Sequence, residues 1–246
     1  MNCQLSLMKT RLFCCLLALL WMARVCAARE ITVVAGPIPP FSYEDRGRAA
    51  GIAVDLLDAA GKLYGLTFNY RFLPWLRAQS ETRSSSDRII IPLTRTLERE
   101  SQYNWLAELF QYQFVLVSAG APLPRTLEEA KGMRIAVLRG NPAEKILHDL
   151  GFTQVESAFS EEINARKLAV RRIDLWVAAD LAAKSIYRQA GGDPAQLRFG
   201  LKLGDVMHVF LASSPGFNDA ATRDIADGVA RVRVSGEAER IISRYR

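Results

Sequence analysis

Short apolar runs along the chain alternate with segments of helical periodicity. The runs Ile31–Ala35, Phe68–Phe72 and Arg88–Ile91 are rich in β-branched or aromatic residues, which is typical of buried strands. Between them, Gly51–Tyr64 repeats apolar residues every three or four positions and predicts an amphipathic helix, and Trp75–Glu81 predicts a shorter one. This alternation favours an α/β fold with largely parallel sheets.

A second series of the same kind follows a break at Gly120–Pro124. Periodicity alone allows either two domains in sequence or one large doubly wound sheet. The elements that we expect in this series are strands at 114–118, 134–138, 155–158, 175–179 and 206–212, and helices that begin at Thr126 and span 142–150, 161–171, 181–190 and 218–246.

The first 28 residues differ from the rest of the chain. Lys9 and Arg11 precede the apolar run Leu12–Met22, and small residues at 25–28 follow it, which is the layout of a cleaved secretory signal peptide. The run is shorter than the roughly 20 apolar residues of a membrane helix. An uncleaved signal anchor is the alternative.

Cysteine usage agrees with export, because all four cysteines lie in this leader. The mature chain then has no disulfide, no thiol nucleophile and no thiolate metal site. Cys26 raises the alternative of a lipid-modified leader, but Ala23-Arg24-Val25 before it lacks the apolar–small–small run of a lipoprotein signal.

The charge balance of the mature chain is mild. Three of the 32 basic residues and none of the 26 acidic ones lie in the leader, so 29 basic residues face 26 acidic ones. The signs are interspersed, as in Glu98-Arg99-Glu100. Because nucleic-acid-binding proteins usually cluster their basic residues on one face, we expect no nucleic-acid partner.

The most informative stretch runs from Asp87 to Trp105. An apolar strand ends near Pro92 and is followed by Thr94, Thr96 and Arg99. Strand ends followed by polar turns are where α/β folds build ligand sites. We expect Thr96 to cap a helix, so that its free amides and the Arg99 guanidinium converge on a carboxylate. The alternative is a surface helix start with a solvated arginine.

This stretch resembles the D-x(6)-T-x-T-x-x-R segment of bacterial extracellular solute-binding proteins of the polar amino-acid class. These are the type II periplasmic binding proteins that serve ABC importers. The resemblance covers nearly all of the chain after the leader. It also includes Pro40-Phe41, Gly51, Asp55, Gly140 and Asp180.

The resemblance implies a two-lobed fold with a discontinuous first domain and a two-strand hinge. Residues 29–118 plus 209–246 would form lobe 1, and residues 119–208 would form lobe 2. It further implies a monomeric periplasmic receptor without cofactor or metal. Such a receptor would bind an amino acid or a similar small zwitterion and present it to an ABC permease in the inner membrane.

Gly140 and Asn141 form a second turn of interest. Asn141 is a good N-cap, Pro142 a good first helical residue, and Glu144 can return a capping bond, so the turn suits an anion. The alternative is an ordinary strand-to-helix turn. The relatives usually have Gly-Thr-Thr here, and Asn141 and Pro142 depart from it by losing one hydroxyl and one N–H.

Asp180 and two aromatic residues complete the candidate binding site. Asp180 follows the apolar strand Leu175–Ala179, and the resemblance implies that it pairs with a ligand ammonium while Arg99 holds the carboxylate. Its alternative role is a helix N-cap. Phe41 lies where the relatives place a ligand-facing aromatic, and Trp75 is either a pocket residue or part of the core.

Motifs that would indicate catalysis are absent from the sequence. His148 and His208 are the only histidines, and the chain has no Gly-x-Ser-x-Gly elbow, Walker loop or Gly-x-Gly-x-x-Gly turn. We therefore expect no catalytic residue and no enzyme. Two alternatives stay open: a periplasmic dehydratase or lyase acting on a prephenate-like carboxylic acid, and a stand-alone sensory ligand-binding module.

Overall fold

The computed structural model describes residues 29–245, so the predicted signal peptide at 1–28, with its four cysteines, lies outside the described residues. Within 29–245, no helix combines the length and the apolar character that crossing a membrane requires. The same residues bring together no group of His, Cys, Asp or Glu side chains that would suit a metal ion.

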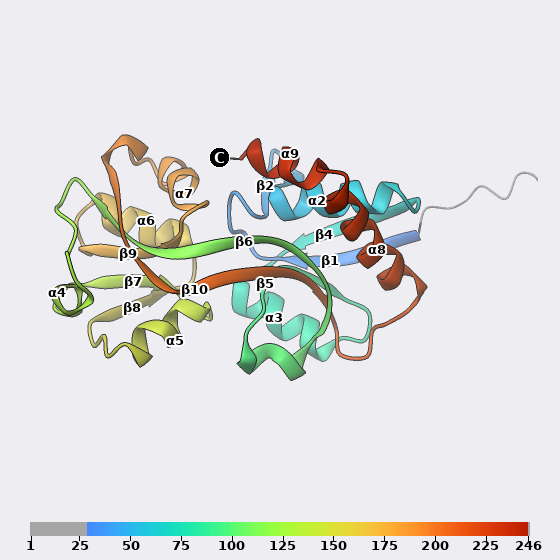
Figure 1. Ribbon diagram of the computed structural model, residues 1–246, viewed down its shortest axis with the longest axis horizontal. Helices are drawn as coiled ribbons and strands as arrows, with labels where there is room; N and C mark the ends of the chain where they lie inside the picture. The colour runs from blue at the N-terminus through green and yellow to red at the C-terminus, as the bar shows by residue number, and fades with distance from the viewer. Residues whose placement is uncertain (1–28, 246) are drawn as a thin grey trace, which may run out of the picture.

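Two α/β lobes are joined by two long antiparallel strands, β6 (Asn104–Ala119) and β10 (Leu197–Ser213) (Figure 1). One eight-stranded sheet, in the order β4-β1-β5-β10-β6-β9-β7-β8, runs through both lobes. Strands β6 and β10 pair with each other over most of their length and lie at the centre of this sheet. The predicted lobe boundaries, after residues 118 and 208, lie inside these two strands and stay predictions.

Lobe 1 is built on a parallel core in which β1 pairs with both β4 and β5. Successive residues of β1 point to opposite faces: Val33 joins the core cluster under α2, whereas Val34 joins the cluster with Trp75 of α3. The elements of this lobe are β1 (Arg29–Ala35), β2 (Tyr43–Asp45), β3 (Arg48–Ala50), α2 (Ile52–Lys62), β4 (Leu66–Phe72), α3 (Trp75–Ser84), β5 (Ile89–Thr94), the 3-10 turn η1 (Leu97–Gln102), α8 (Ala220–Val234) and α9 (Glu237–Ser243).

Lobe 2 repeats the plan on a smaller scale, with β7 parallel to both β8 and β9. Its last strand, β9, pairs antiparallel with β6, and this pairing continues the sheet from the other lobe. The elements are α4 (Leu127–Lys131), β7 (Ile135–Leu138), α5 (Pro142–Asp149), β8 (Val155–Ala158), α6 (Glu161–Ala169), β9 (Leu175–Ala179), α7 (Ala183–Gln189) and the 3-10 turn η2 (Pro194–Gln196).

The α/β alternation predicted from the sequence is confirmed, and β8 and β9 have the predicted bounds. The two joining strands are much longer than the predicted 114–118 and 206–212. Residues 198–208 of β10 are largely exposed or half-buried, so they lack the apolar run that identifies a strand. The segment after Thr96 is a 3-10 turn rather than an α-helix.

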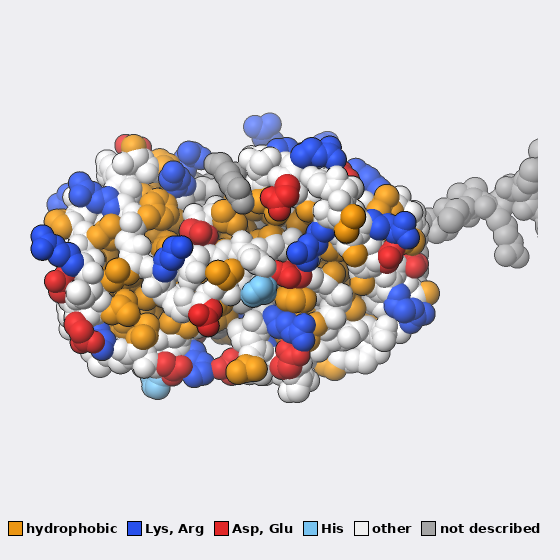
Figure 2. Space-filling view, viewed as in Figure 1, with side chains coloured by type: hydrophobic (Ala, Val, Ile, Leu, Met, Phe, Trp, Pro, Cys, Tyr) orange, Lys and Arg blue, Asp and Glu red, His pale blue; other side chains and the backbone are white. Residues whose placement is uncertain are grey.

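Charged side chains are dispersed over the molecular surface. On the face shown in Figure 2, lysine and arginine side chains are scattered over both lobes, with aspartate and glutamate among them. This face carries no continuous basic area, in agreement with the near balance of charges in the mature sequence.

Candidate functional site

A small cavity lies where the two lobes meet. Its volume is about 30 Å³, which is room for about two water molecules. Apolar and aromatic side chains make up most of its lining. The predicted site residues that line it are Phe41, Trp75, Thr94 and Arg99 from lobe 1 and Asn141 from lobe 2.

Arg99 connects the two lobes at this cavity. The residue is only 9% exposed, and burial lowers the pKa of the guanidinium below its usual value. Nη1 donates to the carbonyl oxygen of Thr94 at 2.9 Å, and Nη2 donates to the carbonyl oxygen of Gly140 at 2.6 Å. The predicted solvated alternative for Arg99 is therefore wrong.

The wall of the cavity in lobe 1 is a cluster of aromatic rings. Phe41 stacks at a tilt on Phe110, with ring centroids 4.8 Å apart, and on Tyr112 at 5.6 Å. The Tyr112 hydroxyl lies 3.1 Å from Oγ1 of Thr94. These contacts hold Phe41 and Thr94 in fixed orientations at the cavity surface, as a preformed site requires.

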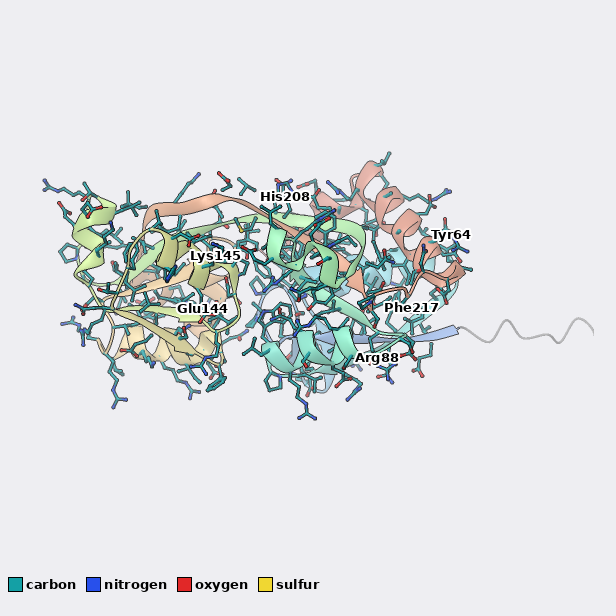
Figure 3. All side chains as sticks on the ribbon, turned by 90° about the horizontal axis from the view of Figure 1, so that it is seen from below. Tyr64, Arg88, Glu144, Lys145, His208 and Phe217 are labelled. Carbon is teal, nitrogen blue, oxygen red and sulfur yellow. The ribbon has the colours of Figure 1, made fainter. Side chains whose placement is uncertain are left out.

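The turn at Gly140 uses its own side chains to satisfy its amides. The Gly140 N–H donates to Oε2 of Glu144 at 2.6 Å, and the Ala143 N–H donates to Oδ1 of Asn141 at 2.8 Å. Figure 3 shows Glu144 in lobe 2 from below. Because these amides are occupied, the turn lacks the free donors of the predicted anion site and is an ordinary capped helix start.

Gly140 also lies in close contact with the other lobe. Its φ of +74° is the left-handed conformation that glycine adopts most easily. A Cβ at this position would lie 2.3 Å from Cδ2 of Leu76, on α3 of lobe 1. The backbone of one lobe therefore packs directly on a side chain of the other.

Thr96 and Gly140 line an open groove between η1 and α5, of about 840 Å³, which adjoins the cavity at Arg99 and Asn141. Thr96 is the residue that precedes η1, but its side chain makes no capping bond to a backbone amide. The capping role predicted for Thr96 is therefore wrong.

Asp180 lies apart from the cavity. It is exposed and lines a different pocket, of about 530 Å³, with Lys184 and Arg188 of α7. Its Oδ1 accepts from the Leu181 N–H at 2.8 Å and from the Gln113 N–H at 3.2 Å. The structure thus does not bring Arg99 and Asp180 together in one cavity, nor does Asp180 cap α7, which begins at Ala183.

Glu161 lines the cavity, and the sequence analysis did not single it out. It is the first residue of α6 and is 5% exposed. Its Oε2 accepts from Trp176 Nε1 at 2.8 Å and from Asn164 Nδ2 at 3.2 Å. Burial raises the pKa of Glu161 to about 7, although these two hydrogen bonds oppose the rise. Its position at the start of the helix that follows β8, three residues after the strand ends, was the available signal, but with Glu162 it resembles an ordinary acidic first turn.

The two histidines do not come together. His208 lies on β10 between the lobes (Figure 3), and its Nδ1 is 2.8 Å from Oε1 of Glu108. His148 is on α5 in lobe 2, with a side chain that is 87% exposed. Neither lines the cavity.

Comparison with known proteins agrees with this architecture. The family model of bacterial extracellular solute-binding proteins, family 3, matches residues 31–246. No curated protein matches the chain in sequence.

Several solved structures are similar over most of the chain. A histidine kinase sensor domain with similarity to periplasmic binding proteins has a TM-score of 0.80 at 20% identity, covering 89% of this chain and 96% of that chain. An ancestral arginine-binding protein bound to arginine has a TM-score of 0.75 at 21% identity, covering 88% and 97%. The arginine-, lysine-, histidine-binding protein ArtJ from Geobacillus stearothermophilus has a TM-score of 0.76 at 18% identity, covering 88% and 95%.

At these identities the likenesses show the fold alone. That fold is the two-lobed type II periplasmic binding protein fold, which confirms the fold that the resemblance in sequence implied.

Proposed function

Because the chain belongs to the bacterial extracellular solute-binding proteins of family 3, we propose that it captures a small polar ligand, such as an amino acid, in the periplasm. The ligand binds in the cavity between the lobes, and the observation that carries this proposal is the buried Arg99 that spans them. The protein acts as a monomer that binds and releases its ligand without catalysis, metal or cofactor. Residues 1–28 direct its export to the periplasm and are removed by cleavage.

Binding is coupled to movement of the lobes. A cavity of about 30 Å³ is too small for most amino acids, so the lobes separate to admit the ligand and close on it. The pair β6 and β10 is the hinge, and the hydrogen bond from Arg99 to Gly140 forms only on closure. A ligand that bridges both lobes stabilises the closed state by its differential affinity for it.

Arg99, Thr94 and the aromatic wall form the part of the site that lobe 1 contributes. Arg99 uses two of its five N–H donors for the carbonyl oxygens of Thr94 and Gly140, and its remaining N–H groups donate to a ligand carboxylate in the closed state. Phe41 and Trp75 pack on the apolar part of the ligand. Asn141, on the other lobe, closes the cavity from the opposite side.

Two partners fit a protein that closes on a solute. Delivery to an ABC permease of the inner membrane is supported by family membership. A sensory role is the second candidate, and it is favoured by the likeness to a histidine kinase sensor domain, which has the highest TM-score of the three structures described. The two roles share the binding site and differ in which partner protein recognises the closed form.

A thermal-shift screen of amino acids tests the proposal, because a ligand that binds only the native state raises the unfolding midpoint. With the ligand found, Arg99→Ala should lose on the order of 2–5 kcal/mol of binding, because a buried charge contact disappears. Arg99→Lys should also fail, since an ammonium does not replace the planar fork.

Arg77→Ala is the matched control, since this exposed arginine lies on α3 of the same lobe and outside the cavity. Wild-type affinity in Arg99→Ala would reject the role of Arg99. Multiple turnovers of a prephenate-like acid by the wild-type protein would contradict the binding function itself.

A further inference from the structure

A carboxylate without a cationic partner lies in the wall of the cavity. The two hydrogen bonds to Glu161 both reach Oε2, and Oε1 accepts none from the described residues. No lysine or arginine among the described side chains, at residues 30–245, forms an ion pair with it. Burying a carboxylate is costly unless a positive charge or further donors compensate for the lost water.

The polar groups of the cavity other than Glu161 offer donors rather than a counter-charge for an ammonium group, or already have partners within the protein. Each terminal nitrogen of Arg99 donates to one carbonyl oxygen, the Gly140 and Ala143 amides donate to side chains, and the Asn141 amide donates to the carbonyl oxygen of Leu138. Oε1 of Glu161 is therefore an acceptor with unused capacity beside an aromatic wall. Aromatic faces and a carboxylate together are the chemistry that proteins use to hold an ammonium group.

A purely structural role does not require an acid at this position. The two bonds that Glu161 makes inside lobe 2 come from the Trp176 and Asn164 N–H groups. The carbonyl oxygen of a glutamine would accept both of them at the same length of side chain and without a buried ionisable group. The negative charge of Glu161 therefore goes beyond what these two hydrogen bonds need.

We propose that Glu161 binds the ammonium group of the ligand, in place of Asp180. The recognised chemistry is a small primary amine, either a simple amine or the α-ammonium of an amino acid. This inference rests on the proposed function, in that the ligand occupies the cavity between the lobes. The rings of Phe41, Trp75 and Tyr112, which line the same cavity, stabilise the bound cation from the side of lobe 1.

The test is calorimetric titration of the exported protein with three probes at pH 8: ethylamine, L-alanine and propionate. Ethylamine carries the ammonium alone, propionate the carboxylate alone, and L-alanine both. We expect L-alanine to bind and propionate not to bind, and binding of ethylamine would identify the ammonium group as sufficient. Glu161→Gln should weaken amine binding at least tenfold while it keeps the bonds to Trp176 and Asn164.

Two variants serve as matched controls. Glu162→Gln removes a charge from the exposed neighbour on the same helix, whose partner is Arg166. Asp180→Asn removes the charge at the rival position. Both should retain affinity within twofold.

The pH dependence gives a second readout. Wild-type affinity for the amine should fall at least tenfold between pH 8 and pH 5, as Glu161 takes up a proton, and Glu161→Gln should show no such fall. Arg99 and Tyr112, the other titratable side chains that line the cavity, keep their charge over this range.

The outcomes separate this inference from the proposed function. Unchanged affinity in Glu161→Gln, or a tenfold loss in Asp180→Asn instead, overturns the inference and leaves solute capture intact. Binding of propionate without binding of ethylamine or L-alanine likewise overturns the inference and leaves solute capture intact. Failure of every solute in a broad panel of amino acids, amines, acids and sugars contradicts both.

Discussion

Arg99 and Gly140 join the two lobes through a single hydrogen bond, in which Nη2 of the arginine donates to the carbonyl oxygen of the glycine at 2.6 Å. The same guanidinium is fixed to its own lobe by the bond from Nη1 to the carbonyl oxygen of Thr94. Since the two bonds use different nitrogens, the bond to Thr94 does not depend on the bond to Gly140, and it would hold the guanidinium in place in the proposed opening of the lobes. This arginine therefore both lines the cavity and bonds one lobe to the other.

Gly140→Ala should destabilise the closed arrangement. The left-handed φ of +74° costs alanine roughly 1–2 kcal/mol, and the new Cβ would lie 2.3 Å from Cδ2 of Leu76 in the other lobe. We expect a lower unfolding free energy and a larger radius of gyration by small-angle scattering. Gly120→Ala is the control, since Gly120 has a similar φ of +68° and open space around its Cβ position.

The double variant Gly140→Ala with Leu76→Ala removes the steric contact and keeps the backbone strain. It should return the radius of gyration toward the wild-type value. If Gly140→Ala behaves like Gly120→Ala in both measurements, contact with Leu76 does not limit closure.

Gln113 should prove important for the hinge. Its Nε2 lies 2.9–3.1 Å from three carbonyl oxygens of β10, those of Leu203, Gly204 and Asp205. Gln113→Leu leaves these carbonyls without that donor, at a cost of roughly 1–3 kcal/mol in urea unfolding. Gln111→Leu, two residues earlier on the exposed face of β6, should cost less than 0.5 kcal/mol, about the limit for surface changes. Equal losses in the two variants would rule out a special role for Gln113.

How well the strands could be predicted from the sequence depended on how deeply each strand is buried. Strands with buried surroundings, such as Leu175–Ala179, appear in the sequence as continuous apolar runs, and both ends of this strand were predicted. Strand β10 has polar residues at 198–208 because this part is largely exposed between the lobes, so periodicity could not reveal that two long strands carry the hinge.

The candidate site was predictable only for residues whose contacts in this structure match the roles that the resemblance implied. Arg99 and Thr94 were predicted, and they line the cavity. Asp180 lines another pocket, because its carboxylate bonds to the Leu181 and Gln113 amides beside β6. Glu161 was missed because an acid in the first turn of a helix is common, and only the fold shows that this one is buried.

Export can be checked independently of the ligand. The layout of residues 1–28 predicts a mature protein that begins near Ala28 or Arg29. N-terminal sequencing and intact mass of protein from the periplasmic fraction give the answer. Residues 1–20 retained in that material would show that the leader is an anchor rather than a cleaved signal.

The raised pKa of Glu161 predicts how stability changes with pH. Burial raises this pKa from 4.5 to about 7 in the folded protein. Below pH 4.5 the carboxyl group is protonated in both the folded and the unfolded chain. Between pH 4.5 and 7 only the unfolded chain releases the proton, so the unfolding free energy falls as pH rises, by roughly 3 kcal/mol in total.

Glu161→Gln removes this contribution, since an amide does not titrate. Relative to wild type, the variant should be nearly equal in stability at pH 4 and more stable at pH 8 by most of that amount, as urea unfolding across this range would measure. Glu162→Gln, at an exposed position, should follow the wild-type curve. Parallel curves for wild type and Glu161→Gln would mean that the carboxyl group titrates at its ordinary pKa. If the two curves separate above pH 4.5 as expected, the buried carboxylate of Glu161 lowers the unfolding free energy of the wild-type protein. A bound ammonium group would offset this loss.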